Sequence, residues 1–267
     1  MARDPGLESR VAETLEGYFA LGNEVIDLGS GRFIRNRTHS SIHDANHGVP
    51  VRVDTEGQIE EVFEHAEQIY AGYQDRLFLC SSCTPAAFQA RLVVEGYAIS
   101  TEVQLVLEGN LDVSAREVGI RRAETDSDWD SLYRLLRLDH KEDARRFGGS
   151  ELTEDVTRCM LAVYRAKCPP LRFWIANEDG VDCGFFSSWP GENGVGKVED
   201  LFTQEEFRGR GIAMALIERA VIDARERGAG PIVIGARLND WPKRFYHRLG
   251  FRPILLQHQF HKQLSET

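Results

Sequence analysis

The chain has 267 residues, of which 42% are hydrophobic and 28% are charged, and its formal net charge is −10. This length and composition predict two globular domains. The negative charge argues against a general affinity for nucleic acid, which needs basic surface. No apolar run reaches the ~18 residues of a membrane span, and the first residues lack the pattern of a secretory signal. We therefore expect a cytoplasmic protein with no nucleic-acid or membrane partner.

The N-terminal half predicts strands that alternate with helices. Apolar residues at helical spacing from Ile59 to Ile69 indicate one helix. Thr84 and Pro85 supply the cap and first position of a second helix, which ends at Gly96. Strands are expected around these helices at residues 51–53, 77–80 and 99–107.

A break near residues 109 to 117 precedes a longer series of predicted elements. Thr125, Asp126 or Asp128 can cap a helix, and a second helix covers residues 153–166. Later helices are expected at residues 212–227 and 241–249. Strands are expected at residues 118–120, 173–176, 183–186, 198–203, 232–234 and 251–260. This order of elements predicts an α/β fold with a mixed central sheet.

The N-terminal half repeats the end of this pattern in a weaker form. Gly96-Tyr97 and Gly250-Phe251 end helices at equivalent places, and a strand follows each helix. We interpret the chain as a diverged internal duplication, with domains at residues 1–115 and 116–267.

The strongest functional signal is the run Arg208-Gly209-Arg210-Gly211-Ile212-Ala213, between a predicted strand and a predicted helix. Glycines let backbone N–H groups turn inward, and the start of a helix adds the positive end of its dipole. Together these features predict a site for a pyrophosphate. A bare glycine pair would be weak evidence for such a site.

Four features in order resemble the GNAT N-acetyltransferases. The run at residues 208–213 matches the Q/R-x-x-G-x-G/A motif, and Val198 to Thr203 resembles the strand before it. Asn239 precedes Phe245-Tyr246 as in the family, and Leu249-Gly250-Phe251 is the family's usual ending of that helix. The resemblance covers about residues 117 to 260. It implies a GNAT-type sheet in the C-terminal domain and a degenerate GNAT-like domain before it.

The resemblance also implies the co-substrate and its site. We expect acetyl-CoA, with no metal, bound by Leu201, Phe202, Thr203, Asn239 and the six residues Arg208 to Ala213. Backbone N–H groups near Leu201 to Thr203 would hold the pantetheine arm and polarise the thioester carbonyl. The acceptor would be a small-molecule or lysine amine, and the protein a monomer or homodimer.

Acyl transfer to an amine needs a base for the amine and an acid for the departing thiolate. Glu199 is the first candidate for the base, through a water, because spermidine/spermine acetyltransferases have a carboxylate at the equivalent place. Asp200 ranks second, because strand alternation places it on the opposite face. Tyr246 is the candidate acid. The alternative for Glu199 and Asp200 is a carboxylate at a sheet edge with no catalytic role. The alternative for Tyr246 is an aromatic residue of the core.

The N-terminal half lacks these features. Residues 54–57 precede its first helix with no basic residue and no glycine pair, and Leu92 stands where Tyr246 stands in the second half. We expect this half to pack on the active domain and to shape the acceptor pocket.

Several weaker patterns have simpler interpretations. Gly191 to Lys197 has GxxxxGK spacing, but a strand follows it rather than a helix. His39, His43 and His47 would share a helix face and could bind a metal, although a polar face is the plainer interpretation; His258 and His261 are weaker still. The lone Cys80-Ser81-Ser82-Cys83 motif lacks the second ligand pair of a zinc site.

Two other functions remain as rivals. A module that binds coenzyme A but has lost catalysis would keep the glycine run. An NAD(P)-dependent oxidoreductase would also use a glycine loop, but its first glycine follows the strand directly and an acidic residue ends the next strand. Here residues 204–208 separate the strand from Gly209, and residues 235–237 contain no acid.

Overall fold

The computed structural model describes residues 6–51, 53–82, 84–112 and 115–264. These residues form two compact units that interleave along the chain. The first unit comprises Met1–Tyr18, Val106–Ile234 and Arg244–Arg252, and the second comprises Phe19–Leu105, Gly235–Lys243 and Pro253–Thr267. The predicted domains at residues 1–115 and 116–267 stay a prediction.

The first unit contains a mixed sheet in the order β10-β9-β8-β7-β6. Its strands are β6 (Gly119–Arg122), β7 (Arg172–Glu178), β8 (Val181–Trp189), β9 (Gly196–Thr203) and the start of β10 (Ile232–Arg237). The β9–β10 pair is parallel and the other pairs are antiparallel. The predicted mixed α/β fold is therefore confirmed.

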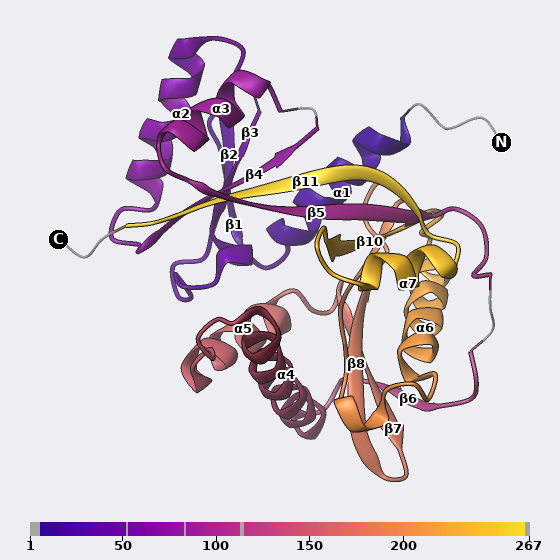
Figure 1. Cartoon of the computed structure of the whole chain (residues 1–267). Helices are drawn as coiled ribbons and strands as arrows, with labels where there is room; N and C mark the ends of the chain where they lie inside the picture. Colours follow the sequence, from indigo (N-terminus) through magenta and orange to yellow (C-terminus); the bar gives the residue numbers. More distant parts are fainter. Residues whose placement is uncertain (1–5, 52, 83, 113–114, 265–267) are drawn as a thin grey trace. The chain divides into compact units, whose positions relative to one another are not determined.

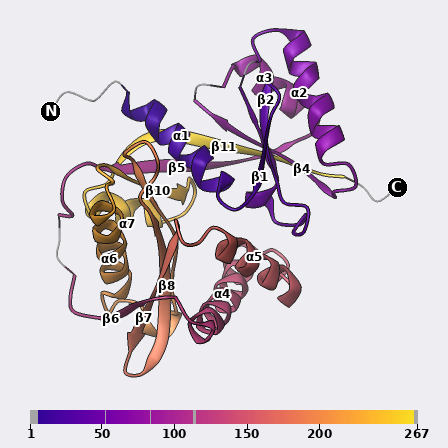
Figure 2. The ribbon, with the colours of Figure 1, turned by 180° about the vertical axis from the view of Figure 1, so that it is seen from behind.

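Helices cover both faces of this sheet (Figure 1 and Figure 2). One face carries α6 (Ile212–Glu226), where the Asp223 carboxylate accepts a hydrogen bond of 2.6 Å from Ser188 of β8. The other face carries α4 (Asp126–Phe147) and α5 (Glu154–Ala166). There Phe173 packs against Trp129 of α4 and Tyr164 of α5. Thr125, one of the three residues predicted as the cap, caps α4 in a capping box with Asp128.

Most of α1 (Leu7–Ala20), a helix that the sequence analysis does not predict, belongs to the first unit. Its buried stripe includes Leu7, Val11, Leu15 and Tyr18. Tyr18 packs on Trp189 at the end of β8, with ring centroids 6.3 Å apart. A Cβ atom added at Gly17 would lie 3.0 Å from the Trp189 ring, so a larger residue there would require the ring to shift by a few tenths of an ångström. The N-terminal segment therefore forms part of the unit that contains β9 and α6.

The second unit contains a sheet in the order β1-β2-β3-β4-β11-β5. Its strands are β1 (Glu24–Asp27), β2 (Gly31–Arg35), β3 (His47–Pro50), β4 (Asp75–Ser81), β5 (Ala98–Leu107) and β11 (Arg252–Gln263). The last strand, β11, pairs antiparallel with β4 from Gln257↔Ser81 to Gln263↔Asp75. The core joins this sheet to α2 (Glu56–Ile69) and α3 (Ala86–Val94), with Phe78, Phe88 and Leu92 fully buried.

The prediction of a strand at residues 51–53 is wrong. The strand is β3, and it ends at Pro50, whose ring fixes φ and removes a backbone donor.

Two residues that fall within motifs of the sequence analysis, Arg52 and Cys83, lie outside the described ranges. Cys80 is buried, and burial raises the pKa of its thiol to about 12. None of the helices within the described ranges is long and apolar enough to cross a membrane.

The helices α3 and α7 (Pro242–Arg248) end in the same way. Gly96 and Gly250 both adopt positive φ, at 86° and 99°. The Tyr97 N–H donates to the Leu92 carbonyl at 3.0 Å, and the Phe251 N–H donates to the Tyr246 carbonyl at 3.1 Å. This Schellman geometry satisfies the last helical carbonyls. The shared ending, with Leu92 and Tyr246 in equivalent roles, supports the proposed duplication.

An ion pair on the first unit's sheet generates a prediction about acid stability. Hydrogen bonds from Arg121 to Asp182, of 2.7 and 2.8 Å, hold the pKa of that carboxyl well below its usual range. We expect Asp182→Asn to lower the free energy of unfolding at pH 7 by about 1 kcal/mol, the upper value for a partly exposed pair. Because the folded pKa is depressed, this contribution exists above the unfolded pKa of about 3.9 and disappears as the pH falls below it.

Urea unfolding at pH 7, 5 and 3 measures this effect. Asp179→Asn is the matched control, because Asp179 is exposed in the adjacent turn and its φ of 52° also suits asparagine. A difference between Asp182→Asn and the parent that persists unchanged at pH 3 would contradict the assignment.

Candidate active site

A bulge interrupts β9 opposite β8. The register passes from Ser187↔Glu199 to Phe185↔Phe202, so Asp200 and Leu201 together oppose Phe186. Asp200 has φ of 65°, in the left-handed region that side chains other than glycine, asparagine and aspartate seldom adopt. A bulge of this kind bends the strand and re-aims its side chains.

Two tyrosine hydroxyls hold the bulged residue. Tyr18 of α1 donates to one carboxylate oxygen of Asp200 at 3.2 Å, and Tyr164 of α5 donates to the other at 2.8 Å. Both tyrosines are buried. These hydrogen bonds to a carboxylate compensate for the cost of the unusual backbone conformation.

The expected placement of Asp200 on the face opposite Glu199 is wrong, because the extra residue breaks the period-two alternation. Lys197 forms an ion pair with Glu199, and its ammonium lies 5.0 Å from the ring centroid of Tyr18. The hydroxyl of the same tyrosine reaches Asp200. The two candidate carboxylates therefore lie around one tyrosine.

Two buried lysines complete this group. The Lys167 ammonium lies 4.0 Å from the ring centroid of Tyr18, and the Lys167 and Lys197 residues are only 1% and 2% exposed. Cations at a ring face are attracted by its quadrupole, more strongly where water is excluded. The Glu199 side chain remains 29% exposed. Glu199 can therefore contact a water while Lys197 fixes its position.

The strands β9 and β10 pair only over a short stretch. The parallel register runs from Ile232↔Gly196 to Ile234↔Val198, whereas β9 continues to Thr203. The Gln204 N–H donates to Cys183 on the β8 side, so the backbone groups of Thr203 point to the opposite side by alternation. The Thr203 carbonyl there accepts a hydrogen bond of 2.9 Å from Arg208. The far half of β9 thus presents backbone donors along an edge that β10 leaves unpaired.

The loop after β9 leads through two glycines into the start of α6. Gly209 and Gly211 adopt φ of 74° and 81°, and Gly211 caps the helix without a side-chain hydrogen bond. The first helical bond runs from the Ala215 N–H to the Gly211 carbonyl. The N–H groups of Ile212 and Ala213 precede that bond and lie at the positive end of the helix dipole.

Arginine side chains brace this loop. Arg208 forms a 2.5 Å ion pair with Glu142 of α4, and Arg210 lies over the Phe207 ring at 5.2 Å. Arg116 donates to the Arg210 carbonyl and forms an ion pair with Glu178. The arginines therefore fix the loop shape, and the backbone N–H groups are its main donors.

The remaining predicted residues lie on other elements. Tyr246 is buried on α7, with its ring 5.9 Å from that of Phe245 and 6.2 Å from that of Phe251. Asn239 lies in the turn between β10 and α7, in a segment that belongs to the second unit.

Sequence reasoning missed Tyr18, Tyr164, Lys167 and Lys197. Lys197 could have been predicted from the sequence, because a residue two positions before Glu199 lies on the same face of the strand. Tyr18 carried no signal, since it is 182 residues from its partner Asp200.

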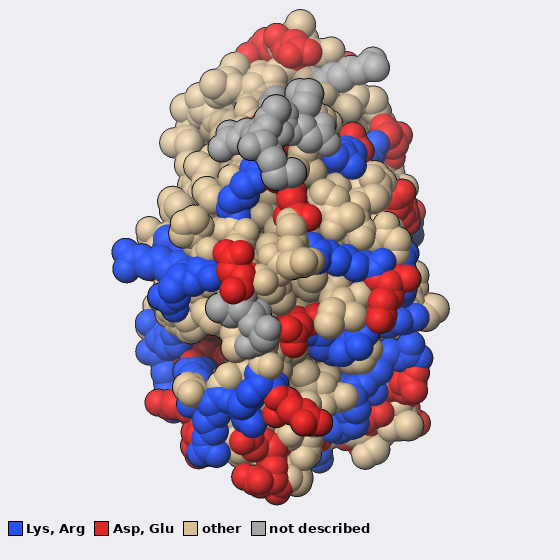
Figure 3. Space-filling model, turned by 90° about the vertical axis from the view of Figure 1, so that its right-hand side faces the viewer, with Lys and Arg blue, Asp and Glu red and all other residues tan. Residues whose placement is uncertain are grey.

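Charges of both signs interleave on the face drawn in Figure 3. Acidic side chains stand between the Lys and Arg side chains there, in accord with the net charge of −10. On this face a polyanion would be held by local donors rather than by a broad positive field.

A comparison with protein families matches residues 169–253 to the acetyltransferase (GNAT) domain. That segment contains the bulged β9, the glycine loop, α6 and Tyr246. Residues 169–253 are therefore similar to a GNAT domain.

One known protein is similar in sequence to part of the chain. An uncharacterized N-acetyltransferase of Methanocaldococcus jannaschii is 35% identical over 71 residues, which are 26% of this chain and 31% of that protein. The match thus spans about a third of the relative's length.

Solved structures match the fold over nearly the whole chain. A GCN5-related N-acetyltransferase from Kribbella flavida has a TM-score of 0.72 at 16% identity, covering 97% of this chain and 96% of that one. A tandem GNAT protein from the clavulanic acid biosynthesis pathway has a TM-score of 0.56 at 11% identity, covering 96% of each chain. The GNAT-type fold predicted from the sequence is therefore confirmed.

The bulge generates a stability prediction. Asp200→Ala removes the acceptor of two tyrosine hydroxyls and leaves a Cβ-bearing residue at positive φ, so we expect a loss of about 2–4 kcal/mol in the free energy of unfolding. Asp200→Asn keeps one oxygen and suits positive φ, so its loss should be nearer 1 kcal/mol. Urea unfolding of both variants gives the comparison, and equal stability of the two would show that the tyrosine bonds do not hold the bulge.

Proposed function

We propose that this protein is an acyl-CoA-dependent N-acyltransferase that moves an acetyl or short acyl group from coenzyme A to a primary amine by direct attack. The observation that carries the proposal is the combination of the bulge in β9, the early end of its pairing with β10 and the double-glycine start of α6. These three features supply backbone donors in a row, along a strand edge and then at a helix start.

The residues present fit coenzyme A. A pyrophosphate needs several N–H groups that converge, which the positive φ values of Gly209 and Gly211 and the uncapped start of α6 provide. A pantetheine arm needs strand-like donors, which the unpaired edge at Leu201 to Thr203 supplies.

The chemistry divides among the chain's own residues. Acyl-CoA, when bound, supplies the thioester carbonyl and the leaving thiolate. Backbone N–H groups at Leu201 to Thr203 would orient and polarise that carbonyl. Glu199 would take a proton from the amine through a water, with Lys197 keeping its carboxylate in place. Tyr246 would give a proton to the coenzyme sulfur.

Glu199 is a better base than Asp200 in this proposal. Both carboxylate oxygens of Asp200 already accept hydrogen bonds from tyrosines, whereas Glu199 is partly exposed. Tyr18 would place α1 beside the acceptor. Of the N-terminal half, α1 would then be the part that shapes the acceptor pocket. The acceptor itself would be a small-molecule or lysine amine.

The rival without catalysis, a coenzyme A-binding module, shares the same loop. Thioester turnover over a panel of amines separates the two functions, because a module would bind coenzyme A and release no thiol with any acceptor. Tight binding of a nicotinamide cofactor would instead favour an oxidoreductase.

Coenzyme A should bind at one site per chain, and Gly211→Asp should weaken it at least ~100-fold. Aspartate tolerates the cap position and positive φ, so the fold survives. Its Cβ would lie 3.4 Å from the Arg116 side chain, and its charge would lie at the helix start that the proposed pyrophosphate occupies and cost several kcal/mol of binding free energy. Isothermal titration calorimetry measures this, with Gly211→Asn as a control of equal size and no charge. Equal affinity of the Asp variant and the parent would place the site elsewhere.

The acid–base roles predict separate kinetic effects. Tyr246→Phe keeps the ring and should lower kcat by about 100-fold while coenzyme A affinity stays unchanged, because a proton donor to the thiolate acts in the transition state. Glu199→Gln should lower the rate most at neutral pH and less at higher pH, where more of the amine is already deprotonated.

Steady-state kinetics with an acceptor that turns over well gives both measurements. Tyr133→Phe serves as the control, since that tyrosine carries a cation–π contact with Arg158 on α4 and α5. If Tyr246→Phe keeps the parental kcat, Tyr246 is only a packing residue.

A further inference from the structure

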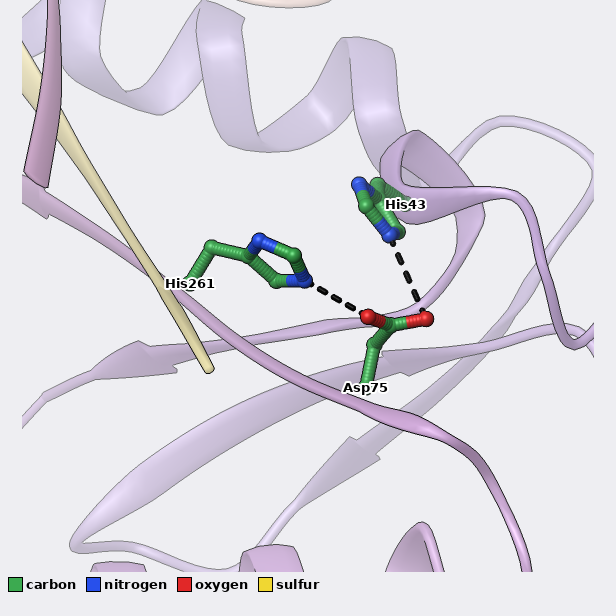
Figure 4. A group of neighbouring side chains, drawn as sticks. All are labelled: His43, Asp75 and His261. Carbon is green, nitrogen blue, oxygen red and sulfur yellow. Dashed lines mark hydrogen bonds and ion pairs between the residues drawn. The ribbon is translucent and has the colours of Figure 1, made fainter. Parts of the chain in front are cut away.

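Three potential metal ligands converge in the second unit. None of them takes part in the chemistry proposed above. His43, Asp75 and His261 offer ligand atoms that all lie within 4.8 Å of one another. The Asp75 carboxylate lies 2.6 Å from Nε2 of His261 and 3.5 Å from Nε2 of His43. Figure 4 shows both imidazoles pointing at opposite oxygens of this one carboxylate.

Strand pairing places two of these ligands. His261 of β11 pairs with Leu77 of β4, and Asp75 lies two residues before Leu77 on the same face. Asp75 and His261 are therefore diagonal neighbours across an antiparallel pair, within reach of each other's side chains.

The third ligand comes from a braced loop. His43 begins the short 3-10 helix η1 (His43–Ala45), which buried Ile42 and Ala45 anchor. The Asn46 side-chain amide donates to the carbonyls of His39 and Ile42 at 2.9 Å each. The loop conformation is therefore set by contacts other than the His43 ring, which makes the three-residue group largely pre-formed.

We propose that His43, Asp75 and His261 bind a divalent transition-metal ion of the zinc class, with water completing the coordination. Two imidazoles and one carboxylate are the donor set of three-ligand zinc sites. At Zn–ligand distances of about 2.0–2.1 Å, tetrahedral ligand atoms lie about 3.3 Å apart, so small rotations of these side chains suffice. The three side chains are 39%, 22% and 34% exposed, which leaves one side of the site open to water.

The histidine spacing seen in the sequence does not produce this site. His39, His43 and His47 would share a face only on an α-helix, and residues 43–45 form a single 3-10 turn. His47 instead contacts the His43 carbonyl through Nδ1 at 3.3 Å, and His258 contacts the Thr101 hydroxyl at 2.9 Å. The partners of His43 in the proposed site, Asp75 and His261, are therefore distant from it in sequence.

A bound ion would tie the loop before β3, the start of β4 and the end of β11 together. It would stabilise the second unit by mass action, because the unfolded chain has no such pre-formed site. The plain alternative is a pair of histidine–aspartate contacts that need no metal.

The test uses the full chain, with any affinity tag removed and metals stripped by a chelator. Calorimetry with Zn²⁺ should give one ion per chain, and Co²⁺ should give the visible absorption of a four-coordinate site. Asp75→Asn and His261→Gln should each weaken Zn²⁺ binding at least ~100-fold, since even outer-shell changes cost 10- to 100-fold. The matched controls are Asp44→Asn and His39→Gln, which change the same residue types in the loop that carries His43 and should leave the affinity unchanged.

A measurement on the parent protein keeps the proposal testable if a variant fails to fold. Imidazole NMR signals of His43 and His261 should shift on addition of one equivalent of Zn²⁺, while those of His258 should not. Absence of stoichiometric binding, or equal affinity in Asp75→Asn and Asp44→Asn, would overturn the site and leave a metal-free contact.

Discussion

The conformation of Asp200 is the constraint on which the rest of the site depends. A non-glycine residue at φ of 65° costs about 1–2 kcal/mol, and the two tyrosine hydroxyls offset that cost. The bulge brings Asp200 to Tyr18, and Lys197, the ion-pair partner of Glu199, lies over the ring of the same tyrosine. Beyond it β9 departs from the parallel register with β10, and Leu201 to Thr203 lie along an unpaired edge. A single extra residue in one strand therefore determines where the candidate carboxylates lie and where the backbone donors for the proposed thioester lie.

The same constraint explains why the first unit includes the N-terminal helix. Tyr18 is at once a hydrogen-bond donor to Asp200, a ring for two buried ammonium groups and a packing partner of Trp189. Two lysines can be buried here because carboxylates and an aromatic face lie beside them. Without α1 the unit would have an exposed Trp189 and a bulge held from one side only. The inclusion of Met1–Tyr18 in the first unit follows from that dependence.

Much of this was predictable from local patterns, and the failures have physical causes. Apolar periodicity, the capping residue Thr125 and the glycines at 209, 211 and 250 identify elements through interactions within a few residues. The bulge escaped prediction because alternation assumes one residue per register step, which Asp200 breaks. Tyr18 and the cluster of His43, Asp75 and His261 escaped because their partners are distant in sequence, and periodicity contains no such information. The strand expected at residues 51–53 was displaced by Pro50, which ends β3.

The arginines around the glycine loop indicate how the proposed site would hold a polyanion in an acidic protein. Arg208 and Arg116 are matched by Glu142 and Glu178, so two of the three arginines at the loop have their charge compensated. Such pairs stiffen the loop, and oriented N–H groups at the start of α6 then contribute fixed partial charges that need no reorganisation on binding. Affinity built in this way depends on the exact backbone path more than on the count of basic residues. The glycines, rather than the arginines, are therefore the residues whose replacement the proposed site should tolerate least.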